Sequence, residues 1–408
     1  MRNLKIYIIA LMVSSFSYGQ TLESLIAEGL KNSPEIQEIQ STYKGIQERK
    51  NEVNTLPNTN FGLGYFLSEP ETRTGAQRLK LSVSQMMPWF GSITTRQNYV
   101  TSIAEAKFVD IAIASRKLIT SISQSYYQLY SNQEKRKILS KNIELLKTYE
   151  TMALTAVETG KASAVDVLKL QIRQNDLEKL VKILEQQYAS EETRMNRFLN
   201  REKDETIALV QELNMPKTIP SVDKSKMAIH PELIKYDKLY QSVEQSELLN
   251  QKDQMPMIGF GLDYVAVAER PGMSFSDNGK DIIMPMFSVS IPIFNKKYRS
   301  KTKQNDLQKE ALVFGKESRK NALITKLETA LNNRISSKIN FDTQVQNLEK
   351  ANNAEQILIK SYESGTLNFN DVLDIQELQL KFQMEKIEAI KSFFIQSTII
   401  HYLSNKPW

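Results

Sequence analysis

Long stretches of the chain carry a helical pattern that nothing in the sequence interrupts. Residues 92–159 contain neither proline nor glycine, and 293–364 contain no proline and a single glycine, Gly315. Since these two residue types most often end a helix, each stretch predicts one continuous helix roughly 100 Å long. Shorter helices are expected over about 21–54, 167–199, 223–253 and 369–403. Helices of such lengths favour a tube or a coiled coil over a globular core.

A second pattern, with a period of two, lies between the opening helix and the long helix of each half. Apolar residues alternate with small or polar ones in "FGLGYFLS" (61–68) and "LKLSVSQ" (79–85), and again in "IGFGLDYV" (258–265) and "FSVSI" (287–291). The alternation predicts half-buried strands joined by polar hairpin loops. The expected strands are about 60–67, 77–87, 257–268 and 282–292, and the loops are 68–76 and 269–281.

The strands by themselves fit two arrangements. They could form small sheets packed on helices, or, with Tyr65, Trp89, Phe90 and Tyr264 at the border of their apolar face, a lipid-facing barrel wall. Four strands cannot close a membrane barrel, because the smallest barrels have about eight and an open edge leaves backbone groups unpaired in lipid. A barrel would therefore need several copies of the chain.

The two halves of the chain repeat one another. The stretch "NSPEIQ" (32–37) returns as "IHPELI" (229–234), and "TAVETGKASAVDVLKLQ" (155–171) returns as "KSYESGTLNFNDVLDIQ" (360–376). The latter pair predicts two helical hairpin tips, at about 159–166 and 364–371, each turning on a glycine. The expected organisation is a signal peptide over 1–19, a first repeat over 20–221 and a second over 222–408.

Composition narrows the class of protein. Arg2 and Lys5, an apolar run, and then Ser17 and Gly19 are typical of a cleaved secretory signal. No later stretch approaches 18 consecutive apolar residues, so no transmembrane helix is expected. The absence of cysteine excludes disulfides, thiolate metal sites and a cysteine-linked lipid anchor. The net charge of +6 is spread over both signs, which argues against a nucleic-acid partner.

Over about 21–403, the order of these elements resembles that of the TolC family of outer-membrane efflux proteins. The stretches "NSPE" (32–35), "HPEL" (230–233) and "PWFG" (88–91) and the two tips also resemble that family. The resemblance implies a fold that is mainly α with membrane β. In it, three chains of four strands each form a twelve-stranded β-barrel in the outer-membrane lipid, continued by a long α-helical barrel across the periplasm.

The same resemblance implies partners and a function. The partners are two further copies in a homotrimer, a periplasmic adaptor protein and an inner-membrane pump of the RND or ABC type. The expected function is a passive exit duct for efflux of metals or drugs, with no cofactor and no catalysed reaction. A type I protein-secretion duct and a structural coiled-coil rod of the periplasm are the alternatives.

The acidic residues of the tips have two possible roles, as helix caps or as cation ligands. Asp166 lies three residues after Ser163, and Asp371 three after Asn368, which is the spacing of a helix N-cap. Asp374 has no such role, and it shares a helix face with Asp371. By position, the resemblance implies that Asp371 and Asp374 form a cation-binding ring that constricts the periplasmic mouth.

The resemblance also implies links that hold the mouth shut. Tyr362 with Asp166 matches such a latch by position, and Lys169 could pair with Asp374. Part of the family pattern is missing, because Leu367 replaces an arginine and Val165 replaces a hydroxyl residue. Closure could instead rest on packing around Leu367 and Phe369. The turns where an adaptor would dock contain Gly160, Lys161, Gly365, Thr366 and Leu367.

Other candidate chemistry is sparse. His230 and His401 are the only histidines, and neither has a second ligand at metal spacing. Several methionines gather near the strands, where they could pack against lipid or neighbouring side chains, or offer thioethers to Cu(I). They are Met86, Met87, Met255, Met257, Met273, Met284 and Met286.

Overall fold

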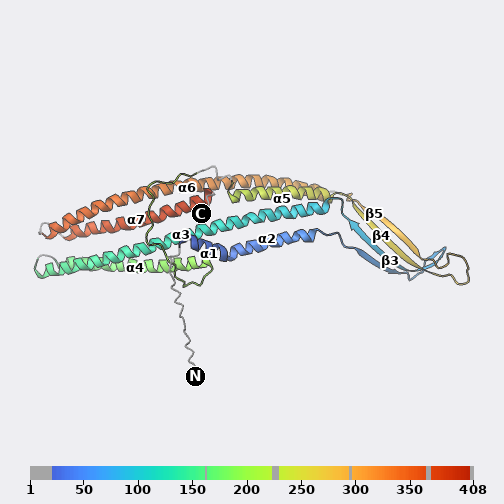
Figure 1. Cartoon of the computed structure of the whole chain (residues 1–408), viewed down its shortest axis with the longest axis horizontal. Coiled ribbons are helices and arrows are strands. Elements are labelled where there is room, and N and C mark those ends of the chain that lie inside the picture. The colour runs from blue at the N-terminus through green and yellow to red at the C-terminus, as the bar shows by residue number, and fades with distance from the viewer. Residues whose placement is uncertain (1–20, 161–162, 223–228, 294–295, 364–368, 405–408) are drawn as a thin grey trace, which may run out of the picture. The chain divides into compact units, whose positions relative to one another are not determined.

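The computed structural model describes residues 21–160, 163–222, 229–293, 296–363 and 369–404. The helices are α1 (Leu22–Asn32), α2 (Pro34–Val53), α3 (Ser92–Glu158), α4 (Ala164–Leu199), α5 (Pro231–Asp253), α6 (Lys296–Glu363) and α7 (Phe369–Ser404). The strands are β1 (Asn60–Tyr65), β2 (Glu71–Thr72), β3 (Gly75–Met87), β4 (Met257–Ala268) and β5 (Ile282–Ser290). They are labelled in Figure 1.

The chain divides into two compact units. One consists of Met1–Pro34, Ser115–Met227 and Ile324–Trp408, and the other of Glu35–Ala114 and Ala228–Leu323. We call them the hairpin unit and the sheet unit. The long helices α3 and α6 contribute to both.

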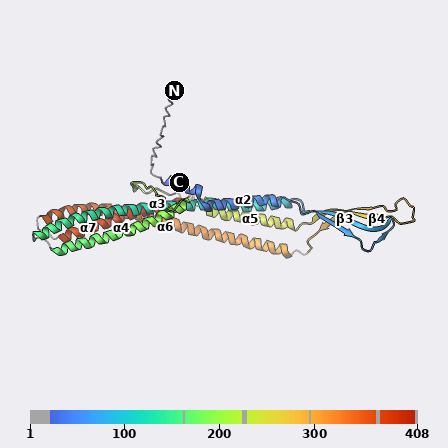
Figure 2. The same ribbon diagram turned by 90° about the horizontal axis from the view of Figure 1, so that it is seen from below.

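The hairpin unit is built from two antiparallel helical hairpins. Buried residues recur every seven positions on α3 (Leu139, Leu146, Ala153) and on α4 (Leu170, Leu177, Leu184), which is the seam of a coiled coil. Val372 on α7 joins the same apolar cluster, and Leu358 and Ile359 on α6 pack against it. The α3–α4 and α6–α7 hairpins accordingly lie side by side in Figures 1 and 2.

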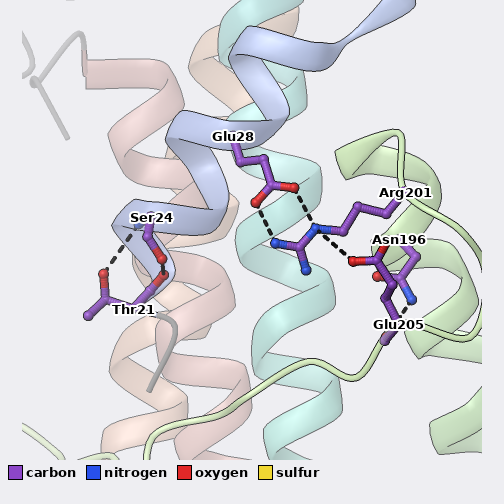
Figure 3. Close-up of polar contacts among 6 residues, drawn as sticks. All are labelled: Thr21, Ser24, Glu28, Asn196, Arg201 and Glu205. Carbon is purple, nitrogen blue, oxygen red and sulfur yellow. Dashed lines mark hydrogen bonds and ion pairs between the residues drawn. The ribbon is translucent and has the colours of Figure 1, made fainter. Parts of the chain in front are cut away.

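The short helix α1 is anchored to the segment that follows α4. Thr21 caps α1 by accepting a hydrogen bond from the Ser24 amide at 3.2 Å. The Arg201 guanidinium pairs with both carboxylate oxygens of Glu28, as Figure 3 shows. Asn196, which is fully buried, donates to the Glu205 carbonyl at 2.7 Å. These contacts tie the start of the first repeat to the end of its last helix.

The opening helix differs from its prediction. The sequence predicts one helix over about 21–54, but α1 ends at Asn32 and α2 begins at Pro34. Ser33 between them has an extended backbone with ψ of 117°. The residue before a proline is disfavoured in the helical region because the proline ring clashes with it, and proline itself is accepted in a first helical turn.

The described residues of the sheet unit form an antiparallel sheet in the order β1-β3-β4-β5, with β2 paired to β3. Register partners run from Asn60 opposite Ser84 to Tyr65 opposite Leu79, and from Met257 opposite Ser290 to Val265 opposite Ile282. Within the described residues, the outer edges of β1 and β5 pair with no other strand. The short strand β2 lies inside the segment 68–76 that the sequence predicts as loop.

Polar contacts and one glycine hold the helices of the sheet unit together. Lys238 on α5 pairs with Glu105 on α3 at 2.8 Å, and Asn250 on α5 donates to the Tyr298 carbonyl on α6 at 3.0 Å. A Cβ atom at Gly315 would lie 2.8 Å from Cε1 of Tyr236, so glycine lets α5 and α6 approach closely. Gly315 therefore serves packing and does not interrupt α6.

None of the described helices has a stretch both long and apolar enough to cross a membrane.

Candidate functional site

The described residues of the first tip are a glycine with positive φ and a capping box. Gly160 has φ of +71°, a conformation that L side chains rarely adopt, and a Cβ there would meet no atom within 4 Å. Backbone conformation is thus the reason for glycine at this position. After the turn, the Val165 amide donates to Ser163 Oγ at 3.2 Å and the Ser163 amide donates to the Asp166 carboxylate at 3.3 Å. Asp166 thereby stabilises the start of α4.

The second tip is described only from Phe369 onward. Lys161 of the first tip and Gly365, Thr366 and Leu367 of the second lie outside the described residues. On α7, the side chains of Asp371 and Asp374 are exposed, while Val372 between them is buried in the apolar cluster. The two carboxylates therefore lie on the solvent side of α7. The cation ring itself stays a prediction.

Polar contacts between α4 and α7 connect the two tips. Lys169 Nζ donates to Asn370 Oδ1 at 3.0 Å. One to two helical turns farther from the tips than this contact, Arg173 pairs with Glu377 at 2.7 Å. These side chains and Asp374 line one cavity of about 280 Å³. Lys169 thus shares a cavity with Asp374, and the pairing of their charges stays a prediction.

Tyr362 lies near the end of α6. It is half-buried and packs against the apolar cluster that contains Leu170 and Val372. Its aromatic ring therefore helps to hold the two hairpins together. The latch between the Tyr362 hydroxyl and Asp166 stays a prediction.

A buried polar network that the sequence pattern did not predict lies farther from the tips. The Tyr149 hydroxyl on α3 donates to Glu355 on α6 at 3.1 Å. Gln376 on α7 donates to the same carboxylate and, at 3.3 Å, to the Tyr149 oxygen. Gln379 donates to Glu355 at 2.8 Å. The network joins three helices through one carboxylate.

Burial has a clear electrostatic effect in this network. Tyr149 is 5% exposed. Burial, together with the adjacent charge of Glu355, raises the pKa of the Tyr149 hydroxyl far above its ordinary value, because both disfavour a phenolate. The hydroxyl stays protonated and remains a donor. Gln376 and Gln379, polar residues on the buried stripe of α7, were the only signal in the sequence.

The sheet presents two chemically different faces. On one face the side chains of alternate residues are apolar and exposed. They include Phe61 (81%), Leu63 (73%), Phe260 (53%), Ile283 (67%) and Phe287 (65%). In Figure 1 the strands run beyond the ends of α2 and α5, so these helices do not cover that face. A contiguous exposed apolar surface of this kind marks contact with another protein or with lipid.

The opposite face of the sheet carries small and polar residues, together with the buried Val265 and Val267 on β4. Gly62 and Gly64 on β1 lie opposite Ser82 and Lys80 on β3. Lys80 pairs with Asp263 on β4, whose side chain is fully buried. A charged pair and serines on one face, with aromatic residues on the other, is the alternation that strands show between a lipid face and a water face.

Comparisons with known structures identify the fold. The chain aligns with the outer-membrane channel OprN at a TM-score of 0.78 and 16% identity, covering 95% of this chain and 90% of that one. It aligns with the outer membrane protein VceC of Vibrio cholerae at 0.72 and 15% identity, covering 94% and 96%. The match to the CmeC outer membrane channel of Campylobacter jejuni has a TM-score of 0.75 and 12% identity, covering 94% and 85%.

The chain has the TolC-family fold. The fold that the sequence resemblance implies is therefore confirmed, with long helices and a small antiparallel sheet in one chain. No family model matches the sequence. No curated protein matches it either. At 12–16% identity the structural likeness establishes the fold alone. The function therefore has to follow from the residues of this chain.

The described part of this TolC-like chain contains no group of three or more histidine, aspartate or glutamate side chains that could hold a metal ion. His230 serves a structural purpose: its Nδ1 accepts a hydrogen bond from the Glu232 amide at 3.3 Å and so caps α5. His401 lies on the last turn of α7.

Proposed function

We propose that the chain is one subunit of a trimeric outer-membrane exit duct, a member of the TolC family. In this proposal three sheets join through the edges of β1 and β5 into one barrel, and the helices continue it into the periplasm. The duct passively conducts cargo that an inner-membrane pump and a periplasmic adaptor deliver. The sequence repeats 20–221 and 222–408 would each supply half of the subunit's wall, after export directed by residues 1–19.

The chemical difference between the two faces of the sheet is the main support for this proposal. Its apolar face exposes aromatic and branched side chains, its other face holds Lys80 paired with Asp263, and neither outer edge pairs with another described strand. An open edge in lipid would leave backbone amides and carbonyls without partners, which costs several kcal/mol for each group. Edge-to-edge pairing with further copies removes that cost and turns the polar face toward a water-filled interior.

The tips are the proposed periplasmic mouth. Asp371 and Asp374 from each copy would form an acidic ring, because both side chains are exposed on the same face of α7. Confined carboxylates repel one another unless a cation or a proton lies between them, so divalent cations would bind there and block the current. The turns that contain Gly160, Lys161, Gly365, Thr366 and Leu367 would contact the adaptor.

Two sets of links would keep the mouth narrow. The first is the contact of Lys169 with Asn370 and of Arg173 with Glu377, which joins the hairpins within one chain. The second is the latch of Tyr362 with Asp166 and of Asp374 with Lys169. Opening would require these polar links to separate.

Single-channel conductance in a planar bilayer tests the proposal. The purified chain should insert as trimers and carry a small, cation-selective current that divalent cations block from the periplasmic side. Asp371→Ala combined with Asp374→Ala should relieve the block. Asp176→Ala is the matched control, since Asp176 is an exposed acid that pairs with Lys179 on its own helix.

Three outcomes count against the proposal. A monomer in detergent that never inserts would contradict the duct itself. Inserted trimers whose divalent block survives the double substitution would contradict the acidic ring and leave the duct in place. A block relieved equally by Asp176→Ala would show that general surface charge is responsible.

A further inference from the structure

The side of α2 that faces away from α3 is exposed and acidic. The ring of Tyr43 packs against Phe108 on α3, with ring centroids 5.2 Å apart. Glu52 follows Tyr43 by nine positions, which is two and a half turns at about 3.6 residues per turn, so Glu52 lies on the opposite side of the helix. The exposed residues of that side, which we call the α2 outer face, are Ser41, Gly45, Glu48 and Glu52.

Gly45 has no structural explanation within the chain. It lies in the interior of α2, where glycine weakens a helix relative to alanine. Its φ is not positive, and a Cβ atom there would meet no atom within 4 Å. A glycine at this position is accounted for if another molecule approaches the α2 backbone closely, as Gly315 allows α5 and α6 to do.

The side of α6 that faces away from α5 is basic and apolar. Asn305 is fully buried and accepts a hydrogen bond from Ser246 on α5 at 3.3 Å. Lys296 and Phe314 lie nine positions before and after Asn305, and therefore on the opposite side. The exposed residues of that side, which we call the α6 outer face, are Lys296, Lys303, Leu307 and Phe314.

The two outer faces carry opposite charges that are not neutralised within the chain. Residues 296–305 contain five basic residues and no acidic one. Within the part of the chain that the structure describes, Lys296 and Lys303 have no ion-pair partner. The same holds for Glu48 and Glu52. Opposite unpaired charges on exposed helix faces suit a contact between two molecules.

The order of elements brings these faces together when two sheets join edge to edge. Helix α2 leads into β1 and α6 follows β5, and these strands form the outer edges of the sheet. In Figures 1 and 2, α2 and α6 are the outer helices of the sheet unit. Pairing of β1 with β5 of the next copy therefore sets α2 beside that copy's α6. Counted from the sheet, Glu48 is level with Lys303, and Ser41 with Leu307, to within about one helical turn.

We propose that the α2 outer face binds the α6 outer face of a second copy of this chain. The proposal depends on the proposed duct, because it assumes that β1 pairs with β5 of the next copy. Glu48 pairs with Lys303 and Glu52 with Lys296, while Gly45 lets the neighbouring side chains approach the α2 backbone. Like charges disfavour contacts of α2 with α2 or of α6 with α6, so the contact also selects which faces meet.

Crosslinking tests the contact, and the absence of cysteine from the sequence makes introduced thiols specific. A Ser41→Cys chain co-expressed with a Leu307→Cys chain and treated with a short bismaleimide should give crosslinked dimers on a denaturing gel. Either variant expressed alone should give none. The matched control replaces Leu307→Cys by Leu248→Cys, an exposed position on α5, and should also give none.

Exchange of the charges tests the ion pair. Glu48→Lys and Lys303→Glu should each raise the dissociation constant between copies about two- to fivefold, the effect expected for one exposed ion pair. The chain with both substitutions keeps its net charge and should recover the original affinity, because the pair forms again in reverse. Analytical ultracentrifugation of the full chain in detergent measures the constant.

The outcomes separate this contact from the duct. Conducting trimers that lack the crosslink between positions 41 and 307 would overturn the contact and leave the duct in place. Equal crosslinking with Leu248→Cys, or a double variant that associates no better than the single ones, would also overturn the contact. Crosslinked dimers of a chain that carries no current would support the contact and contradict the duct.

Discussion

Lys169 on α4 donates a hydrogen bond to the side chain of Asn370 on α7, across 3.0 Å and 201 positions of sequence. The contact joins the second turn of α4 to the first turn of α7, the helices that follow the two tips. Arg173 and Glu377, farther along the same helices, add a second link. Because these groups are largely exposed, each link contributes little free energy by itself. Together they bias the position of one hairpin against the other.

Removing both links should favour an open mouth. Asn370→Ala with Arg173→Ala should raise the open-to-closed ratio about two- to fivefold, which corresponds to roughly 0.5–1 kcal/mol for exposed polar pairs. Single-channel open probability measures this ratio. Lys179→Ala is the control, since its partner Asp176 lies on the same helix. An unchanged open probability would show that the links do not restrain the mouth.

The Tyr362 hydroxyl provides a separate test of closure. Tyr362→Phe keeps the ring that packs on the apolar cluster and removes only the oxygen. If the hydroxyl is a latch, conductance should increase while the melting temperature stays nearly constant. Tyr43→Phe, in the sheet unit, should change neither quantity. A Tyr362→Phe duct with unaltered conductance would refute the latch.

Glu355 should matter to stability more than its neighbours on α6. In Glu355→Leu, Tyr149 and Gln376 lose their shared acceptor inside the bundle, and unsatisfied buried groups cost about 1–3 kcal/mol each. Thermal unfolding followed by circular dichroism should show a marked decrease in melting temperature. Glu349→Leu, an exposed position of the same helix, should have little effect. Equal melting temperatures for both variants would mean that the network contributes nothing.

The carboxylate of Glu388 should make stability depend on acid pH. Burial raises its pKa, but hydrogen bonds from Lys135 at 2.6 Å and Lys391 at 2.5 Å outweigh burial, so the pKa is lowered below the ordinary 4.5. A lowered pKa contributes stability that is present above the unfolded value and is lost as pH falls through the folded value. Between about pH 5 and pH 3, the melting temperature should therefore decrease less in Glu388→Gln than in the unaltered chain. Parallel melting curves would exclude this contribution.

The two faces of the sheet should tolerate charge differently. Leu262→Arg places a cation on the apolar face and should impair insertion, at a cost of about 2–4 kcal/mol if the position lies near the middle of the bilayer. Ser84→Arg, on the polar face opposite Gly261, should insert nearly normally. The folded fraction recovered in lipid vesicles distinguishes them. Equal recovery would contradict a lipid-facing role for the apolar face.

Local sequence patterns predicted much of the fold. The proline- and glycine-free stretches predicted α3 and α6 to within a few residues, because helix continuity depends on each residue's own backbone preference. Spacing likewise predicted the cap formed by Ser163 and Asp166, a contact across three residues. The opening helix was predicted wrongly as one piece, although Pro34 held the signal for the break.

The sequence by itself determined the helix lengths, the alternation of the strands and the turn at Gly160, since each depends on neighbours in the chain. Only the tertiary structure decided which distant side chains meet. Tyr149 reaches Glu355 across 206 positions, and Met86 lies over Gly259 because β3 and β4 pair in one register out of many. Such contacts follow from how helices and strands pack, and that register is a property of the whole fold.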